Sequence, residues 1–427
     1  MADVLTRDDP LYEELYDVRR EAMEMGNLIE EDVNPKLAEL RAHGSVHKGS
    51  LRSLLGLPEV KRHKVGLDRQ SYTVLGFAEC ETAFRENGRY SSHIIHHPNP
   101  TDEQLMGILE MDGLQHLAYR KTLQPMFIKP RTLTWWRQRW INDIVETLIE
   151  RLKHQDRAEL NLEYCARVPV HTVTRAIGLE GDDALVFRQA LMRSSEISQI
   201  APEVRAAASE TVWRMLAELI GCRREVPGDD VVSKLIEATV QLPDGTERPL
   251  SDREIAINSR LVMVAGGGTS WRQFGITLWA LLSRREQLEA VKADRSLVDA
   301  AIEESVRWNV TAPVFSRLVT EDVELGGVAI PEGSVVELCT GAANRDPSRW
   351  DNPDDYDLHR AAKPHLGFGI GQHQCLGMNV ARSEINVGIN ALLDAFPDLR
   401  LDPEAPAPFL TGGLEQRGIS ALPVLLR

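Results

Sequence analysis

The sequence predicts a mainly α chain with a minor β region, folded as a single domain. Three observations predict this fold class. Apolar residues recur at helical spacing through the middle of the chain, short β-like pieces are confined to residues 314–338, and no repeat, low-complexity tract or linker-like run divides the 427 residues. The hydrophobic content of 43% is ample for a large buried core.

The predicted helices come first along the chain. The segment "DGLQHLAYRKTLQPMF" indicates one helix, and from Leu133 to about Cys222 the apolar spacing stays helical. A long apolar helix is expected from about Ser251 to Ser283, although "VAGGGTSW" at residues 264–271 interrupts it with three glycines. Each glycine inside a helix costs roughly 1 kcal/mol relative to alanine, so we expect a close neighbour at this point to offset the cost. The segment "DRSLVDAAIEESVRWN" predicts a further helix.

The pattern changes after Val314. The pieces "FSRLVT", "VELGGVAI" and "SVVELC" predict short strands, because Gly-Gly and Pro-Glu-Gly turn signals separate them. An irregular tract from Asn344 to Cys375 follows, and a helix is expected from Leu376 to about Ala395. Long irregular segments inside a compact domain are usually functional or disordered. Because this one delivers Cys375 to the start of a helix, we expect it to be functional.

Charge and cysteine use exclude several classes of function. The chain has 64 acidic and 49 basic residues and a net charge of −15, which argues against nucleic acid as a general partner. The N-terminus lacks an apolar signal sequence, and no apolar run approaches the roughly 20 residues that a bilayer requires. We therefore expect a cytoplasmic protein without a membrane anchor. Five widely spaced cysteines disfavour a disulfide framework or a structural zinc site.

The segment "HLGFGIGQHQCLG", residues 365–377, is suited to holding a thiolate. Its glycines allow tight turns, and a helix N-terminus after Cys375 stabilises a negative charge. A lone buried cysteine is the default alternative, and a catalytic Cys–His pair with His373 is another. A dinucleotide fingerprint does not fit, because Gln374 stands at the third glycine position and no strand precedes the segment; a phosphate loop would need a lysine.

The same residues resemble a known family. "FGIGQHQCLG" resembles the haem-ligand loop, FGxGxHxCxG, of the cytochromes P450, which are haem-thiolate monooxygenases. "EESVR" resembles the ExxR pair of the family, "HLAYR" its HxxxR pair, and "ANRDP" and "RLVTEDVELGGVAIPEG" two later segments. The resemblance spans about Ser45 to the C-terminus. It implies the cytochrome P450 fold, with a haem domain at residues 45–427 and an N-terminal extension at residues 1–44 that packs on or precedes it.

The resemblance also implies roles for single residues. Haem b (iron protoporphyrin IX) would be the cofactor, and Cys375 would be its iron ligand. Phe368 would pack over the thiolate, and Gly377 would lie beside the cofactor. Glu304 and Arg307 would form a structural ion pair, since positions i and i+3 share a helix face. The propionates of the haem would be held by His116, Arg120, Arg317 and His373.

The glycine-rich part of the long helix resembles the distal motif of the family. "AGGGTS" is similar to AGx[DE]T[TS], so this helix would cross the oxygen-binding face of the haem, where the glycines would let the backbone bend and make room. Thr269 would donate a hydrogen bond to the oxygen molecule and, with Ser270, assist proton delivery. Gly268, however, stands where the family usually has an acid. Water, the substrate or another residue would then relay protons, or the chain is not an ordinary monooxygenase; we favour water or substrate.

The implied activity is insertion of one oxygen atom of O2 into a hydrophobic small molecule, such as a terpenoid, a steroid-like or an aromatic compound. Alternatives are a peroxide-driven or non-oxygenating haem-thiolate enzyme and a haem-binding sensor. Specificity would come from variable segments, including residues 91–111, where a polar loop is favoured over a metal site for His93, His96 and His97. Apolar candidates for the pocket lining are Met106, Ile108, Leu109, Met111, Val264 and Trp271. Electrons from NAD(P)H would arrive through a separate ferredoxin. A basic docking group for it would consist of Lys121, Lys129, Arg131, Arg137 and Arg139, and an ordinary charged, solvated face is the alternative interpretation of these residues.

Overall fold

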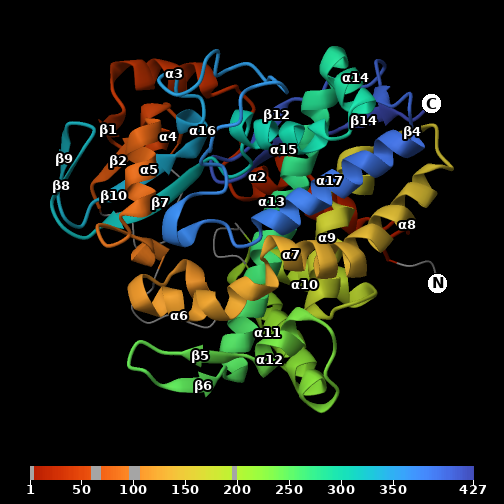
Figure 1. The fold of residues 1–427 in the computed structure, drawn as a ribbon, viewed down its shortest axis with the longest axis horizontal. Coiled ribbons are helices and arrows are strands. Elements are labelled where there is room, and N and C mark those ends of the chain that lie inside the picture. Colours follow the sequence, from red (N-terminus) through yellow and green to blue (C-terminus); the bar gives the residue numbers. More distant parts are fainter. Residues whose placement is uncertain (1–3, 59–68, 96–105, 195–199) are drawn as a thin grey trace.

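Helices make up most of the chain, and a single long one, α13, passes through the middle of the molecule (Figure 1). The computed structural model describes residues 4–58, 69–95, 106–194 and 200–427. The prediction of a mainly α chain with a minor β region is confirmed. No helix in these described ranges is both long enough and apolar enough to span a membrane.

The N-terminal part combines short helices with the first strands of the largest sheet. Its elements are α1 (Leu11–Tyr16), α2 (Val18–Glu24), α3 (Asn34–His43), β1 (Val46–Lys48), α4 (Leu51–Leu54), β2 (Ser71–Val74), α5 (Phe77–Arg85), β3 (Tyr90–Ser91) and the 3-10 helix η1 (Ser92–Ile95). We call residues 4–44 the N-terminal segment. Its Tyr12, Leu15 and Tyr16 are buried against helices from the middle of the chain.

The middle of the chain is helical, as the sequence predicts. It contains η3 (Gly107–Leu109), α6 (Gly113–Leu123), η4 (Gln124–Met126), α7 (Lys129–Arg131), the π-helix η5 (Thr132–Ile141), α8 (Asn142–Leu152), β4 (Arg157–Glu159), the π-helix η6 (Asn161–Cys165), α9 (Arg167–Ile177), α10 (Asp182–Arg193), α11 (Pro202–Glu225), α12 (Val231–Glu237), β5 (Thr239–Gln241), β6 (Glu247–Pro249), α13 (Asp252–Leu282), α14 (Arg285–Ala293) and α15 (Leu297–Trp308). Trp136, Leu148 and Phe274 are fully buried in the main core.

The C-terminal part contains the predicted strands and the predicted last helix. Its elements are β7 (Val314–Val319), β8 (Val323–Leu325), β9 (Val328–Ile330), β10 (Val335–Cys339), α16 (Thr340–Ala343), η7 (Gly371–His373), α17 (Met378–Ala395), β11 (Arg400–Leu401), β12 (Leu410–Gly412), β13 (Arg417–Ile419) and β14 (Pro423–Leu425). The largest sheet has the order β1-β2-β10-β7-β3 and lies at one side of the molecule, on the left in Figure 1. β10 is parallel to β2 and antiparallel to β7.

Helix α13 begins where the sequence predicts. Ser251 accepts a hydrogen bond from the Glu254 backbone, and the Glu254 carboxylate accepts one from the Ser251 backbone. This reciprocal cap satisfies two of the N–H groups that every helix leaves free at its start. The helix then runs without interruption through the three glycines, in contact with α9 on one side and α17 on another.

Candidate functional site

The loop that carries Cys375 is shaped by two glycines with positive φ. Gly369 has φ of 63° and Gly371 has φ of 77°, a region that side chains rarely adopt. A Cβ on Gly371 would lie 2.7 Å from the carbonyl oxygen of Phe84, so the loop packs closely on α5. The Cys375 N–H donates to the carbonyl of Phe368 at 2.8 Å, which closes the loop. The sequence pattern therefore produces a tight turn that presents the Cys375 side chain.

Protein surrounds Cys375 closely enough to alter the ionisation of its thiol. Its side chain is accessible, yet burial raises the pKa of the thiol. The N–H groups of Gly377 and Met378 act in the opposite direction, as expected for a helix N-terminus. Two expectations are therefore corrected. Helix α17 begins at Met378, later than the predicted Leu376. The pKa of Cys375 is raised overall, because in the protein alone the effect of burial is larger than that of the helix N-terminus. The reason is that desolvation disfavours a thiolate unless a cation lies against it.

Four basic side chains come together around this loop. The rings of His116 and His373 lie 4.1 Å apart between centroids. His373 contacts Asp112 at 3.2 Å between Nε2 and Oδ1, and Arg120 donates to the carbonyl of Gln374 at 2.7 Å. Arg317, on β7, is also within electrostatic reach of Asp112. The structure thus brings together His116, Arg120, Arg317 and His373, which the sequence analysis singled out from three separate segments.

The charges and free donors of this group fit a ligand with carboxylates. Among the described residues neither buried ring nitrogen of His116 has a hydrogen-bond partner, and burial lowers the pKa of His116 to about 4. Burial also lowers the pKa of Arg317 to about 10, and within the described part of the chain its side chain hydrogen-bonds to the Ser316 carbonyl alone. Unpaired donors at buried positions are costly, so an anionic partner is expected here. Two propionates beside a thiolate ligand match this arrangement, and the residues present therefore fit a haem.

Glu304 and Arg307 form the expected pair on α15. The guanidinium donates to both carboxylate oxygens of Glu304 at 2.7 Å, and Arg307 is only 1% exposed. Arg307 also donates to the carbonyls of Asn344, Pro353 and Asp355. The pair thereby ties α15 to the irregular tract that leads to the Cys375 loop.

The open side of α13 carries Ala265 and Thr269. Ala265 is exposed in a helix whose other faces are largely buried, and Thr269 is half-buried one turn later. The Thr269 hydroxyl donates to the Ala265 carbonyl at 2.9 Å. Ser270 turns away from this side into the core, beside Glu384 of α17. Burial raises the pKa of Glu384 to about 8.

The glycines of α13 do not point along this open side. A Cβ on Gly266 would lie 2.7 Å from Val173 of α9, and one on Gly267 would lie 3.1 Å from Arg188. Gly268 faces Arg272 and Gln416, each 3.7 Å from the Cβ position. These glycines therefore make room for neighbouring segments of the protein rather than clear the open face of α13. Successive helical residues are rotated by about 100°, so positions 266–268 pack on neighbouring segments instead.

The remaining predicted residues lie as follows. Trp271 is fully buried against Tyr16 and forms core, whereas Met106 and Met111 are half-buried and Ile108 is buried. His93 is exposed on η1; His96 and His97 lie outside the described residues. Within the described part of the chain, no cluster of three or more His, Cys, Asp or Glu side chains suits a metal ion.

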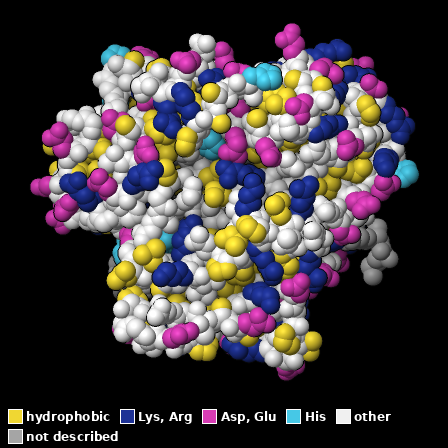
Figure 2. Space-filling view, viewed as in Figure 1, with side chains coloured by type: hydrophobic (Ala, Val, Ile, Leu, Met, Phe, Trp, Pro, Cys, Tyr) yellow, Lys and Arg dark blue, Asp and Glu magenta, His cyan; other side chains and the backbone are white. Residues whose placement is uncertain are grey.

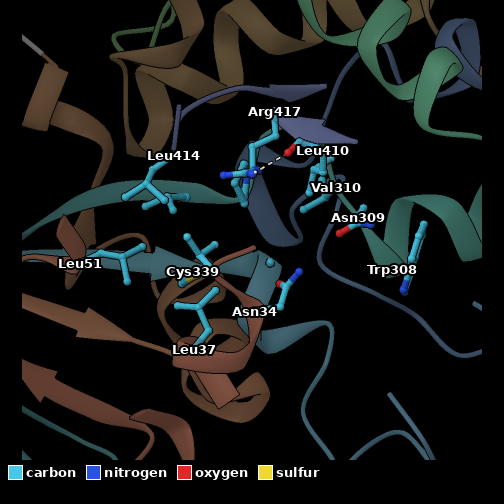
Figure 3. A pocket seen from close by; sticks show the side chains of 14 residues that line it. Asn34, Leu37, Leu51, Trp308, Asn309, Val310, Cys339, Leu410, Leu414 and Arg417 are labelled. Carbon is cyan, nitrogen blue, oxygen red and sulfur yellow. Dashed lines mark hydrogen bonds between the residues drawn. The ribbon is translucent and has the colours of Figure 1, made fainter. Parts of the chain in front are cut away.

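A small cavity lies elsewhere in the molecule. It has a volume of about 30 Å³ and is lined by residues that include Leu37, Trp308, Cys339 and Arg417 (Figure 3). None of the predicted site residues lines it. Its volume suits one or two water molecules rather than an organic substrate.

The sequence analysis missed four polar residues near the site. Asp112 orients His373, Glu384 lies beside Ser270, and Arg272 donates to the Gly268 carbonyl while pairing with Glu21. An arginine inside an apolar helix was the one visible signal, because a buried guanidinium needs a partner. The identity of that partner was not visible, since Glu21 precedes Arg272 by 251 positions.

Comparisons with known proteins agree with the geometry. The cytochrome P450 family model matches residues 195–414. Cytochrome P450 107B1 of Saccharopolyspora erythraea is 34% identical over 74% of this chain and 76% of its own length. The 6-deoxyerythronolide B hydroxylase of the same organism is 32% identical, covering 67% of this chain and 70% of its own.

A solved structure agrees as well. The structure of HmtN, a post-tailoring hydroxylase involved in himastatin biosynthesis, superposes with a TM-score of 0.71 at 30% identity, covering 83% of this chain and 91% of that one. Members of the matched family bind haem through a cysteine thiolate. On these similarities, the chain belongs to the cytochrome P450 family of haem-dependent monooxygenases.

Proposed function

We propose that Cys375 is the iron ligand and that this enzyme oxygenates a hydrophobic small molecule at the open side of α13. One observation carries the proposal: an accessible thiol belongs to a loop that meets a group of basic side chains, in which the ring nitrogens of His116 lack hydrogen-bond partners among the described residues. When bound, haem supplies oxygen activation, which a thiolate ligand favours by donating electron density. The N–H groups of Gly377 and Met378 stabilise the negative charge at Sγ.

The basic group positions the cofactor in this proposal. Asp112 holds the His373 ring by its Nε2. The side chains that would donate to the two propionates of a bound haem are His116, Arg120, Arg317 and His373. Arg120 already bridges α6 to the carbonyl of Gln374, the residue before the ligand, so it orients the loop and the propionate together. Phe368 shields the thiolate from water, with its own ring held under the Arg382 guanidinium at 4.6 Å.

Thr269 serves the reaction on the distal side. Its hydroxyl is accessible and donates its one proton to the Ala265 carbonyl, which leaves its oxygen free to accept a hydrogen bond from water; rotation of the hydroxyl away from the carbonyl would let it donate to oxygen instead. The substrate is a terpenoid, steroid-like or aromatic compound, held near Met106, Met111 and Val264, which are half-buried around the core. The relatives that carry hydroxylase names support oxygenation as the reaction class.

Electrons come from a ferredoxin in this proposal. The basic docking group consists of side chains on α6, α7 and η5, and Figure 2 shows Lys and Arg side chains gathered on the face where these elements lie. Exposed apolar side chains lie on or next to the same elements: Leu114 and Leu117 on α6, Ile128 directly before α7, and Leu133 on η5. An apolar patch with a basic rim suits an acidic protein partner.

The ligand assignment is tested by Cys375→Ser. We expect the purified variant to lose the thiolate signature of the reduced, CO-bound haem spectrum, because a serine hydroxyl does not replace the thiolate. Cys222→Ser is the matched control, since Cys222 is an exposed cysteine on α11. Persistence of the signature in the Cys375 variant would refute the assignment. A Soret titration of the wild type with terpenoids, steroids and aromatic compounds then identifies the substrate class by the shift from low to high spin.

A further inference from the structure

The space at position 268 faces a buried cation. Arg272 lies one turn further along α13, is 2% exposed, and donates through Nη1 to the Gly268 carbonyl. A Cβ at position 268 would lie 3.7 Å from this same nitrogen. Arg188 from α10 approaches the neighbouring glycine, so a second cation lies close by. An uncompensated guanidinium buried here is strongly unfavourable.

The carboxylate that compensates Arg272 comes from the N-terminal segment. Nη2 of Arg272 donates to Oε2 of Glu21 on α2, and the side chain of Glu21 is itself only 12% exposed. Burial lowers the pKa of Arg272 and the proximity of Arg188 adds to this effect, while Glu21 opposes both. The ion pair therefore connects α2 to Arg272 and, through Nη1 of Arg272, to the Gly268 carbonyl beside Thr269.

The N-terminal segment is held in place by close packing as well as by this pair. Val18 of α2 would lie within 3.2 Å of a Cβ on Gly412 and within 2.9 Å of one on Gly418. Asn27 would lie 2.6 Å from a Cβ on Gly413. The glycines of the β12–β13 hairpin thus admit α2, and the rings of Tyr16 and Trp271 meet edge-on at 5.8 Å. Glu21 therefore contacts α13 from a helix that is itself packed against the β12–β13 hairpin.

We propose that Glu21 is a positioning residue of the distal site: the N-terminal segment supplies the carboxylate that α13 lacks at position 268, and it holds Arg272 on the Gly268 carbonyl. This inference rests on the proposed function, in which Thr269 acts on the open side of the same turn. Glu21 neutralises Arg272 from outside the helix and keeps its guanidinium hydrogen-bonded to the Gly268 carbonyl. The backbone directly before Thr269 is thereby held in one position. The N-terminal segment then belongs to the working distal site.

The test is a charge-relocation experiment on the haem-loaded, full-length protein. Imidazole binds on the distal side of the haem, and its Kd is measured from the Soret shift. We expect Glu21→Gln to change this Kd by at least about fivefold, the lower end of typical coupling between sites. Adding Gly268→Asp to Glu21→Gln should return the Kd toward the wild-type value, because the new carboxylate lies next to Nη1 of Arg272.

The matched control is Glu14→Gln. Glu14 also joins the N-terminal segment to the body of the protein, through Arg193 at 2.7 Å, but among the described residues it forms no hydrogen bond or ion pair with α13. Its loss should leave the imidazole Kd unchanged. Thermal unfolding followed by circular dichroism gives a second readout. Gly268→Asp should raise the melting temperature when it is added to Glu21→Gln, but not when it is added to the wild type or to Glu14→Gln.

Three results would overturn the proposal: an unchanged Kd in Glu21→Gln, equal effects of the Glu14 and Glu21 variants, or no rescue by Gly268→Asp. If Glu21→Gln does not fold, the double variant decides, since the proposal requires that it folds. These outcomes are distinct from failure of the ligand assignment, which is seen in the CO spectrum of the Cys375 variant.

Discussion

At the scale of single residues, neighbouring positions on α13 lie in different surroundings. Thr269 lies on the accessible side with Ala265, while Ser270 is buried beside Glu384 and Gly268 faces Arg272. The helical rotation of about 100° per residue separates these environments within one turn. Of Gly268, Thr269 and Ser270, Thr269 alone has an accessible hydroxyl on the open side, so under the proposed function its loss should affect the reaction more than the fold.

We expect Thr269→Ala to raise the hydrogen peroxide released per NAD(P)H consumed on the order of tenfold, because positioned proton transfer contributes on the order of 10²-fold or more. Peroxide and NAD(P)H are measured together, with a compound that shifts the Soret band. Thr269→Ser keeps a hydroxyl and should remain close to the wild type. Equal peroxide release from the alanine variant and the wild type would remove Thr269 from the mechanism.

At the scale of secondary-structure elements, three helices meet at one buried carboxyl group. Glu384 of α17 is 1% exposed and is flanked by Thr172 of α9 and Ser270 of α13. Burial raises its pKa from 4.5 to about 8, although the two hydroxyls lower it in part. The helices around the site thus enclose a carboxyl group that is neutral at pH 7 in the folded protein.

This pKa predicts a pH-dependent cost of folding. Between about pH 5 and 8 the folded state keeps a proton that the unfolded state releases, so the stability of the wild type falls relative to Glu384→Gln as the pH rises. We expect the difference in unfolding free energy to change on the order of 2–4 kcal/mol across this range. Urea unfolding at pH 5 and pH 8 measures it.

The matched control for that experiment is Glu150→Gln, an exposed position on α8. Its profile should run parallel to that of the wild type. Parallel profiles for Glu384→Gln and the wild type would instead show that Glu384 ionises normally in the folded protein.

At the scale of the whole molecule, the face that carries α6 and α7 differs from the acidic average of the chain. Lys121 and Lys129 are exposed there and Arg131 is half-buried, its guanidinium 4.4 Å above the ring of Trp135. Arg139 is partly neutralised by Asp229 at 3.5 Å. The cations of α6 and α7 are therefore the better candidates for contact with an acidic partner.

Neutralising Lys121 and Arg131 together should slow ferredoxin-driven haem reduction about tenfold at low salt, and less at high salt, because screening already weakens the attraction there. Stopped-flow reduction at several ionic strengths measures this effect. Replacing Lys36 of α3 and Lys292 of α14 by glutamine changes the net charge equally at sites away from α6 and α7 (Figure 1), and should have little effect. Equal rates for the first double variant and the wild type at low salt would exclude the patch.

Much of this molecule could be predicted from the sequence alone because the signals are local. The long helix with its Ser251 cap, the short strands after Val314 and the pairing of Glu304 with Arg307 all depend on residues a few positions apart. The Cys375 loop belongs to the same class, since its glycines set the turn within one short segment. The family resemblance added the partners of the loop from distant segments.

Only the tertiary structure decided which surfaces meet. In the folded protein the glycines of α13 face Val173, Arg188 and Arg272, and Trp271 lies in the core. The tertiary structure also brought Glu21 to Arg272 across 251 positions of sequence. No periodicity or spacing carries such information, because a contact between distant residues depends on how whole elements pack. The sequence by itself therefore determined the elements and the haem-binding motifs, and packing decided how charge is balanced around them.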